Sequence, residues 1–461
     1  MGNEEEFLSE VYQEMADLGL ENPKGGRSFQ QIANSYSHKS KIKSEIKLKP
    51  RQSERFWQID VLKVIAMLLV IMDHSTSHAE LRTIGSPLWE RIAIPIFMVV
   101  LGFNWARSLK KNKHLPYSEL FSWRYYWKNK VIHFLLPYSF IYVLSGILIL
   151  IKDPTVSVGI YGSHMFRYLL FPWVYGPGSW FIITLLITVV VFPLVYIIFD
   201  QLKKYKISLL GLIFTFGVEV AWQYFINFSL DGYINNFYGT PDWNYEMYIF
   251  IYFALICNPF RLMTAIGLGL WLSQDQELFS LQNILVWVLG IISGICIFFY
   301  AFYIDEPLPF QWPNWLRFIG LKMQDLFDWS NGDYNFIFFP YPALIVLIFL
   351  NILPKDPKEN LFVRIIIRIS KSTFHILMVQ IFYFMILYNY FLPMFGDPFP
   401  IWQSVYPDVE WVNLMFWPLN VAITFSLGVL WYSLEHKIIA NRRKGEEKEL
   451  LRRAQARGWI N

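Results

Sequence analysis

Charged side chains are scarce in this sequence. Only 16% of the 461 residues are Asp, Glu, Lys or Arg, whereas a soluble domain has roughly a quarter. Hydrophobic residues make up 55% of the chain and aromatic residues 19%. This composition excludes an ordinary soluble domain. It predicts an all-α, polytopic integral membrane protein, because helices satisfy their own backbone hydrogen bonds in lipid.

Cysteine is nearly absent. Cys257 and Cys296 are the two cysteines, and both lie in apolar runs. Two buried thiols exclude a disulfide framework and a cysteine metal centre. The first apolar run follows a long charged tail, so the pattern predicts no cleavable signal peptide. We see no internal repeat, and nothing indicates a nucleic-acid partner.

Long apolar runs, by contrast, are abundant. At roughly 20 residues for each crossing, they predict about ten transmembrane helices. The predicted spans are 57–78, 87–109, 130–151, 179–199, 207–228, 247–272, 281–303, 335–353, 370–391 and 412–436. Lys and Arg residues are concentrated in every second loop between the predicted spans. The 273–280 loop is the one loop on that side without them. By the positive-inside rule, both termini are expected in the cytoplasm of a multi-pass protein of the cell membrane.

Three regions follow from this pattern. Residues 1–54 form a cytoplasmic tail, 55–437 the transmembrane domain, and 438–461 a charged, helix-like cytoplasmic tail. Apolar residues recur at helical spacing near the start of the first tail, which predicts a short amphipathic helix. Its function is either docking or simple contact with the membrane face. The helical positions are Phe7, Val11, Met15 and Leu18.

The stretch from Arg55 to His78 is apolar but carries Lys63, Asp73 and His74. Ionisable groups in hydrocarbon are costly, so they are functional or paired by default. Lys63 and His74 are eleven residues apart, which places them on one helix face and roughly 16 Å apart along the axis. Histidine suits proton abstraction from a hydroxyl, and a nearby carboxylate orients the ring. Adjacent helical residues diverge by about 100°, so Asp73 is expected to face elsewhere.

The string IDVLKVIAMLLVIMDH resembles the first membrane helix of the acyltransferase-3 family, which carries an arginine, ten residues and a histidine. Lys63 stands at the arginine position and His74 at the histidine position. The first helix of the heparan-glucosaminide acetyltransferase-like group is similar. The resemblance covers residues 55 to 437 and implies a membrane acyltransferase in which His74, and by extension Asp73, is catalytic.

Further segments resemble the same family. Lys128, Lys130 and His133 stand where it has a basic pattern before its third helix, which implies contact with the phosphates of acyl-CoA. Positive-inside topology explains such charges equally well. Trp180 stands where the family has aromatic residues at the start of a membrane span. It is either a contact to the acyl-CoA donor or a tryptophan at the membrane interface. Leu101, Gly102 and Phe103 stand where the family has a Ser-Gly-aromatic triplet, and Gly102 allows close helix approach.

Two further charges are expected inside the membrane. Glu219 lies near the middle of the fifth predicted span and Arg261 in the sixth. A structural ion pair between them is one interpretation, and contact of Arg261 with the acyl donor is the other. His74 and His78 have the i, i+4 spacing of zinc ligands, but no third ligand is evident, so we predict no metal.

Together these patterns favour an enzyme that moves an acyl group, most simply acetyl, from cytoplasmic acyl-CoA to a hydroxyl or amino group of an extracytoplasmic carbohydrate or lipid-linked acceptor. No tightly bound cofactor is expected, and homo-oligomers remain open. Direct attack and an acyl-histidine intermediate are equally compatible with the sequence. The alternative is a transporter or channel that uses Lys63, His74, Glu219 and Arg261 as a pathway, although transporters commonly contain repeats.

Overall fold

The computed structural model describes residues 56–75, 88–89, 92–112, 115–152, 178–237, 258–275, 278, 280–299, 336–355, 357–387 and 410–456. The chain divides into two units, one formed by Phe56–Glu435 and the other by Met1–Arg55 with His436–Asn461. The predicted N-terminal amphipathic helix, Cys257 and His78 lie outside the described residues.

Every regular element in the described part of the chain is a helix, as the composition predicts. The elements are α3 (Trp57–Ser75), α5 (Ala93–Lys110), α6 (Tyr117–Leu120), η2 (Trp123–Trp127), α7 (Lys128–Lys130), η3 (Val131–Leu135), α8 (Leu136–Lys152), α11 (Ser179–Lys204), α12 (Ser208–Phe237), η4 (Pro259–Leu262), α14 (Met263–Leu272), α15 (Ile284–Phe299), α17 (Pro340–Ile352), α18 (Leu361–Lys371), α19 (Thr373–Ile386) and α20 (Glu410–Ala456).

Several of these helices are able to span a membrane. Within the described residues, four are long and apolar enough, and the bent pair α18–α19 makes a possible fifth. Three shorter apolar helices accompany them. The four are Tyr125–Leu148, Trp180–Lys204, Ser208–Ile226 and Phe416–Asn441. The protein is therefore an all-α polytopic membrane protein, while the number of about ten spans and the cytoplasmic termini remain predictions.

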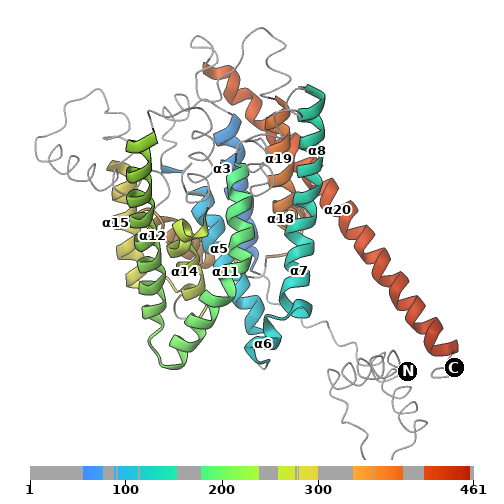
Figure 1. Ribbon diagram of the computed structural model, residues 1–461, viewed down its shortest axis with the longest axis horizontal. Helices are drawn as coiled ribbons and strands as arrows, with labels where there is room; N and C mark the ends of the chain where they lie inside the picture. Colours follow the sequence, from blue (N-terminus) through green and yellow to red (C-terminus); the bar gives the residue numbers. More distant parts are fainter. Residues whose placement is uncertain are drawn as a thin grey trace, which may run out of the picture. The chain divides into compact units, whose positions relative to one another are not determined.

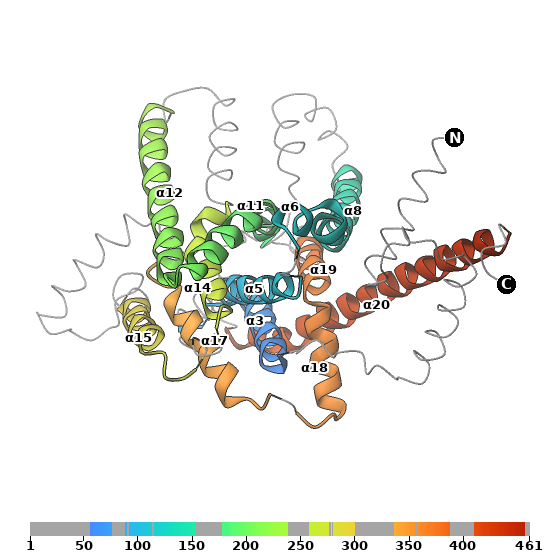
Figure 2. The same cartoon turned by 90° about the horizontal axis from the view of Figure 1, so that it is seen from below.

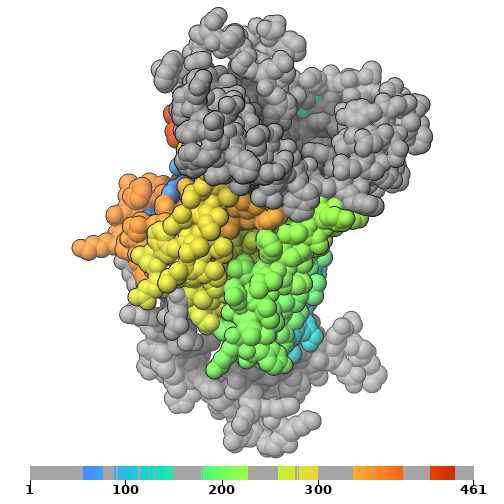
Figure 3. All heavy atoms as spheres, turned by 90° about the vertical axis from the view of Figure 1, so that its left-hand side faces the viewer, coloured from blue at the N-terminus to red at the C-terminus, as the bar shows by residue number. Residues whose placement is uncertain are grey.

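The outward surface of the bundle is apolar and its interior contains polar groups. Figure 3 looks onto the face that carries α15 and α12. Large exposed side chains on these two helices include Ile284, Val288, Ile291, Ile295, Ile213, Phe214 and Phe216. Buried polar side chains include Gln58, Asp60, Thr184, Glu219, Arg261, His375 and Gln380. A lipid-facing apolar surface around a polar interior is the arrangement that a bilayer favours.

Helices α3 and α5 occupy the middle of the Phe56–Glu435 unit. They pack against each other and against α17, while α14 packs on α5 and α19 packs on α3 (Figures 1 and 2). Small residues allow the closest of these crossings. A Cβ atom on Gly102 of α5 would meet the carbonyl group of Ile266 on α14, and one on Gly269 would meet that of Val99. The close approach predicted for Gly102 is confirmed.

We expect Gly102→Ala to destabilise the bundle, because the new methyl group would overlap the α14 backbone. Overpacking of this kind costs roughly 1–3 kcal/mol, so the thermal unfolding temperature of the purified protein should fall. Gly146→Ala in α8 is the matched control, since no atom lies within 4 Å of its added Cβ. Equal unfolding temperatures for the two variants would contradict the close crossing.

Several helix ends are joined by side-chain contacts at one end of the bundle. Lys110 at the end of α5 donates to the carbonyl of Gln274 at 2.8 Å, and Lys203 of α11 pairs with Asp275 after α14. Gln58 of α3 donates to the carbonyl of Leu353 after α17 at 3.2 Å. The ends of α5 and α11, which carry Lys110 and Lys203, therefore lie close together. These two lysines hold the 273–275 segment, which contains Asp275, at this end of the bundle.

Tyr117 joins the same end of the bundle from α6. Its hydroxyl donates to Asp200 of α11 at 2.6 Å and accepts from Gln201 at 3.1 Å. Partial burial, with the hydrogen bond to Asp200, raises the pKa of Tyr117 above its usual value. The phenol therefore stays protonated and remains a donor that ties α6 to α11.

Three helix ends differ from the ends of the predicted spans. Helices α18 and α19 are bent by 67° at a break of one residue, Ser372, so α19 begins at Thr373, inside the predicted span 370–391. Helix α18 has Arg364, Arg368 and Lys371 beside exposed apolar residues, a pattern typical of a helix at a membrane surface. Helix α12 extends beyond the predicted span 207–228 to Phe237, and α20 extends beyond the predicted span 412–436 to Ala456, through the tail that was expected to be helix-like.

Candidate active site

His74 lies near the C-terminal end of α3, where α11 and α19 meet it. Gly178 caps the N-terminus of α11 with a positive φ of 82°. A Cβ atom placed on Gly178 would lie 3.4 Å from Nε2 of His74 and 4.0 Å from Oε1 of Gln380. The ring of Phe384 on α19 stands edge-on to His74, with centroids 6.1 Å apart. Nε2 therefore faces a narrow space that exists because residue 178 has no side chain.

Asp73 lies beside the imidazole, contrary to the expectation from the helical offset. Its Oδ2 is 3.5 Å from Nδ1 of His74, and both side chains are about one-fifth exposed, at 24% and 20%. A carboxylate at Nδ1 favours the tautomer that carries its proton there. Nε2 is then the nitrogen without a proton, and it lies beside Gly178.

The C-terminal end of α3 is anchored by hydrogen bonds to α20. Asn420 donates to the hydroxyl of Ser75 at 3.0 Å and accepts from the hydroxyl of Tyr383 at 2.7 Å. Ser75 also donates to the carbonyl of Ile71 at 2.6 Å. These contacts immobilise the residue next to His74, and a fixed imidazole suits acid–base chemistry.

Lys63 belongs to a second group of polar side chains, further along α3. Its charge acts on Lys130 and on His133, so the three lie close enough to interact. The ammonium of Lys130 stands 3.5 Å from the ring centroid of Trp105 on α5. Lys128 is exposed, because residues two apart on a helix point about 200° apart. The structure thus brings Lys63, Lys130 and His133 together and leaves Lys128 outside.

His133 lies among aromatic side chains of η3 and α19. It keeps an exposed surface although three rings surround it. The rings belong to Phe134, Phe374 and His375, with centroids 5.1, 6.3 and 6.3 Å away.

Trp180, in the first turn of α11, is partly buried and packs against Phe181 with centroids 5.8 Å apart. It lies two residues from Gly178, and therefore near the His74 end of the site.

Glu219 and Arg261 lie close together in the interior, where α12 contacts η4. The Arg261 charge acts on the Glu219 carboxylate, and Glu219 also accepts from the backbone N–H of Thr264 at 2.8 Å. The structural ion pair and the contact of Arg261 with the acyl donor both stay predictions.

Three residues near the two groups were not assigned from the sequence. Gln380 is fully buried beside Gly178, on the apolar helix α19. His375 and Glu435 form a buried pair, with Nε2 2.8 Å from Oε2. Their polar character inside apolar runs was a signal, but their meeting across sixty residues could not be read from spacing.

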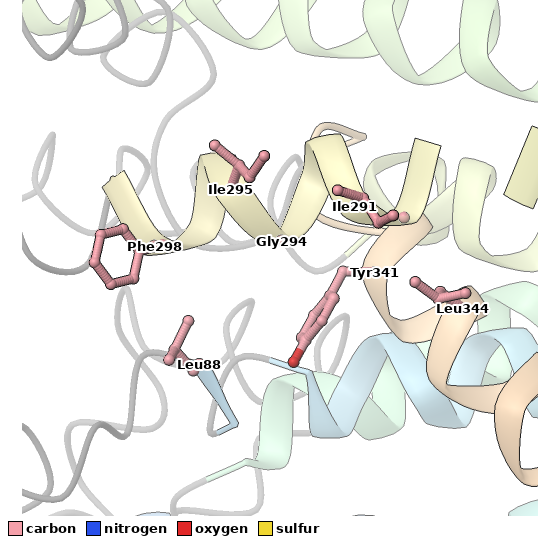
Figure 4. A pocket seen from close by; sticks show the side chains of 8 residues that line it. Leu88, Ile291, Gly294, Ile295, Phe298, Tyr341 and Leu344 are labelled. Atoms are coloured by element: carbon pink, nitrogen blue, oxygen red, sulfur yellow. The ribbon is translucent and has the colours of Figure 1, made fainter. Parts of the chain in front are cut away.

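A pocket of about 330 Å³ lies away from these groups. It is lined by Leu88, Gly290, Ile291, Gly294, Ile295, Phe298, Tyr341 and Leu344. Figure 4 shows the Tyr341 hydroxyl as the polar group among the labelled side chains. This lining offers no acid–base pair. Among the residues that the structure describes, no group of three potential metal ligands is found.

The membrane bundle holds an oriented histidine in its interior, and a basic group lies further along the same helix. This arrangement is typical of integral membrane proteins with polar functional groups inside the bundle. The family model described as "Acyltransferase domain" matches residues 56–436. The chain therefore belongs to the acyltransferase-3 family, as the resemblance implied. No curated protein and no solved structure matches it. Family membership favours an enzyme over a transporter.

Proposed function

We propose that this protein transfers an acyl group, most simply acetyl, from cytoplasmic acyl-CoA to a hydroxyl or amino group of an extracytoplasmic carbohydrate or glycolipid, in the cell membrane. The observation that carries this proposal is the placement of His74 Nε2. It faces the gap at Gly178, with Asp73 on the opposite nitrogen. An imidazole held in this way is suited to act as a general base.

The donor is proposed to enter from the end of the bundle where the basic connections meet. Lys63 and Lys130 lie on that side of His74, and they are suited to the phosphates of coenzyme A. Lys63 and His74 are separated by roughly 16 Å along α3. The extended pantetheine arm has a comparable length, so its thioester would reach the His74 region while its phosphates remain at the lysines.

The chemistry follows from these positions. Nε2 of His74 takes the proton of the acceptor hydroxyl while its oxygen attacks the thioester carbonyl carbon. The carbon–sulfur bond breaks, and the thiolate of coenzyme A leaves and is protonated. Asp73 stabilises the imidazolium that forms. Gln380 is available to orient the reacting groups through its amide, because its Oε1 lies near the same gap.

The test uses the purified full-length protein in proteoliposomes. Labelled acetyl-CoA is supplied on the side of the basic connections, and cell-envelope glycan and glycolipid fractions on the other. We expect label to appear in one acceptor fraction and free coenzyme A to appear on the donor side. Binding of acetyl-CoA without transfer to any fraction, or transfer that requires the donor on the opposite side, would contradict the proposal.

Lys63→Ala is expected to weaken binding of acetyl-CoA by roughly tenfold or more, because it removes a charge-assisted contact from a partly dehydrated site. Lys63→Arg should bind nearly normally, since it keeps the charge and the family carries arginine there. Isothermal calorimetry measures both affinities. Lys128→Ala is the matched control and should have a smaller effect, because Lys128 is exposed. Unchanged affinity in Lys63→Ala would exclude this residue from the donor site.

A further inference from the structure

His375 is buried at the start of α19 and has no role in the chemistry described above. Its ring lies between α20 and η3. On the α20 side, Nε2 is 2.8 Å from Glu435, and the rings of Trp431 and Tyr432 have centroids 5.2 and 5.4 Å away. On the other side, the centroid of the His133 ring is 6.3 Å away. The carboxylate thus fixes one nitrogen of the ring.

The second nitrogen of His375 lacks such a partner. Nδ1 is buried and has no hydrogen-bond partner among the groups that the structure describes. A buried polar atom without a partner is costly, and native structures usually satisfy it with a protein group, a water or a ligand. Because Nε2 is committed to α20, Nδ1 is the polar atom that remains for a ligand in the neighbouring basic group.

The charges around this ring favour an anionic ligand. Electrostatic interactions link His133 with His375, Lys130, Glu435 and Lys63. Glu435 is the one carboxylate of this set, and the other members are two lysines and two histidines. Two nearby ammonium groups repel each other, so an anion with several acceptor oxygens would stabilise the group.

The depth of His375 in the bundle agrees with that of Lys63. Phe384 contacts His74 and is nine residues after His375 on α19, which is roughly 13 Å along the helix. Lys63 is roughly 16 Å before His74 on α3. Both residues therefore lie at about the same distance from His74, on the side of the basic connections.

We propose that His375, oriented by Glu435, is a phosphate-binding residue of the acyl-donor site. Nε2–H donates to Glu435, and Nδ1–H donates to a phosphate oxygen of coenzyme A beside Lys63 and Lys130. The inference rests on the proposed function and deepens it, because it selects donors that carry phosphate groups. A phosphate headgroup of a lipid has the same chemistry and is the other source that the experiment must separate.

The experiment measures binding of coenzyme A and of pantetheine, which lacks the phosphates, by calorimetry. The protein is full length, in nanodiscs of neutral lipid. The first variant, His375→Phe with Glu435→Leu, removes both partners and leaves no buried charge unpaired. The second, Glu435→Gln, keeps a hydrogen-bond acceptor but loses the charge. His436→Phe is the matched control, because this histidine is exposed next to Glu435 in the sequence.

We expect the double variant to bind coenzyme A about tenfold more weakly and to bind pantetheine as the wild type does. Glu435→Gln should show a smaller loss, again confined to coenzyme A, and it decides the question if the double variant does not fold. Equal changes for both ligands, or none for either, would overturn the inference. Loss of anionic-lipid binding in nanodiscs with phosphatidylglycerol, at unchanged affinity for coenzyme A, would likewise overturn it.

The outcome is distinguishable from a failure of the proposed function, because binding does not require an acceptor. A wild-type protein that binds coenzyme A through His375 but transfers no acyl group would refute the transferase chemistry and leave the phosphate site in place. A wild-type protein that binds no coenzyme A would refute both.

Discussion

His74→Ala is expected to abolish acyl transfer, with a loss on the order of a hundredfold or more, while the protein still inserts and binds acyl-CoA. The variant removes the nitrogen that faces the gap at Gly178. His74→Gln should be nearly as inactive, because an amide forms hydrogen bonds but cannot accept the proton. Transfer from labelled acetyl-CoA and binding of coenzyme A are measured on each purified variant.

The control for this experiment is His436→Ala, which removes an exposed histidine from α20 and should leave transfer unchanged. Near-normal transfer in either His74 variant would eliminate His74 as the base. If neither variant accumulates as folded protein, the histidine acts instead as a contact that holds α3 to α11 and α19, and the proposed base is refuted.

Gly178→Ala should reduce the turnover number at least tenfold and change acyl-CoA binding little. Two effects act together. The backbone at this position has a φ of 82°, where a residue with a Cβ atom is disfavoured by roughly 1–2 kcal/mol. The new methyl group would also touch Nε2 of His74 at 3.4 Å and occupy the space that an acceptor hydroxyl needs. Turnover and binding are measured separately on the purified protein.

Gly146→Ala serves as the matched control, since its added Cβ atom meets nothing within 4 Å. Alanine is also the better helix former, so this variant should be at least as stable as the wild type. A Gly178→Ala protein with wild-type turnover would show that the gap is not where the acceptor approaches. A parallel loss of turnover in Gly146→Ala would show that the assay reports stability alone.

The position of Asp73 shows how far side-chain contacts can be predicted from the angle between adjacent residues of a helix. Asp73 was expected to face away from His74, yet its carboxylate lies 3.5 Å from Nδ1. Backbone directions alone diverge by about 100°, but side-chain rotation closes that angle at the end of a helix, where neighbours leave space. The spacing of Lys63 and His74 was more reliable, because eleven residues span three turns of one regular helix.

The sequence by itself determined that this protein lies in a lipid bilayer, and it identified the residues to be tested by mutation. Scarce charge and long apolar runs specify a helical membrane protein. The backbone polar groups of a segment inside a bilayer must form hydrogen bonds within the protein, and a helix forms them within one segment. Lys63 and His74 were identifiable because a charge in an apolar run is costly wherever the helix packs. The family resemblance depended on the same short string, and these properties are local in the chain.

Tertiary packing alone decided which polar groups meet. Lys130 turns inward over Trp105 while Lys128 faces outward, and His375 pairs with Glu435 from another helix. The bend at Ser372, where α19 separates from α18 by 67°, was also invisible to hydropathy, because hydropathy reports composition and not the direction of a helix. Such contacts depend on the rotation and crossing of whole helices, which close packing sets through positions such as Gly102 and Gly178.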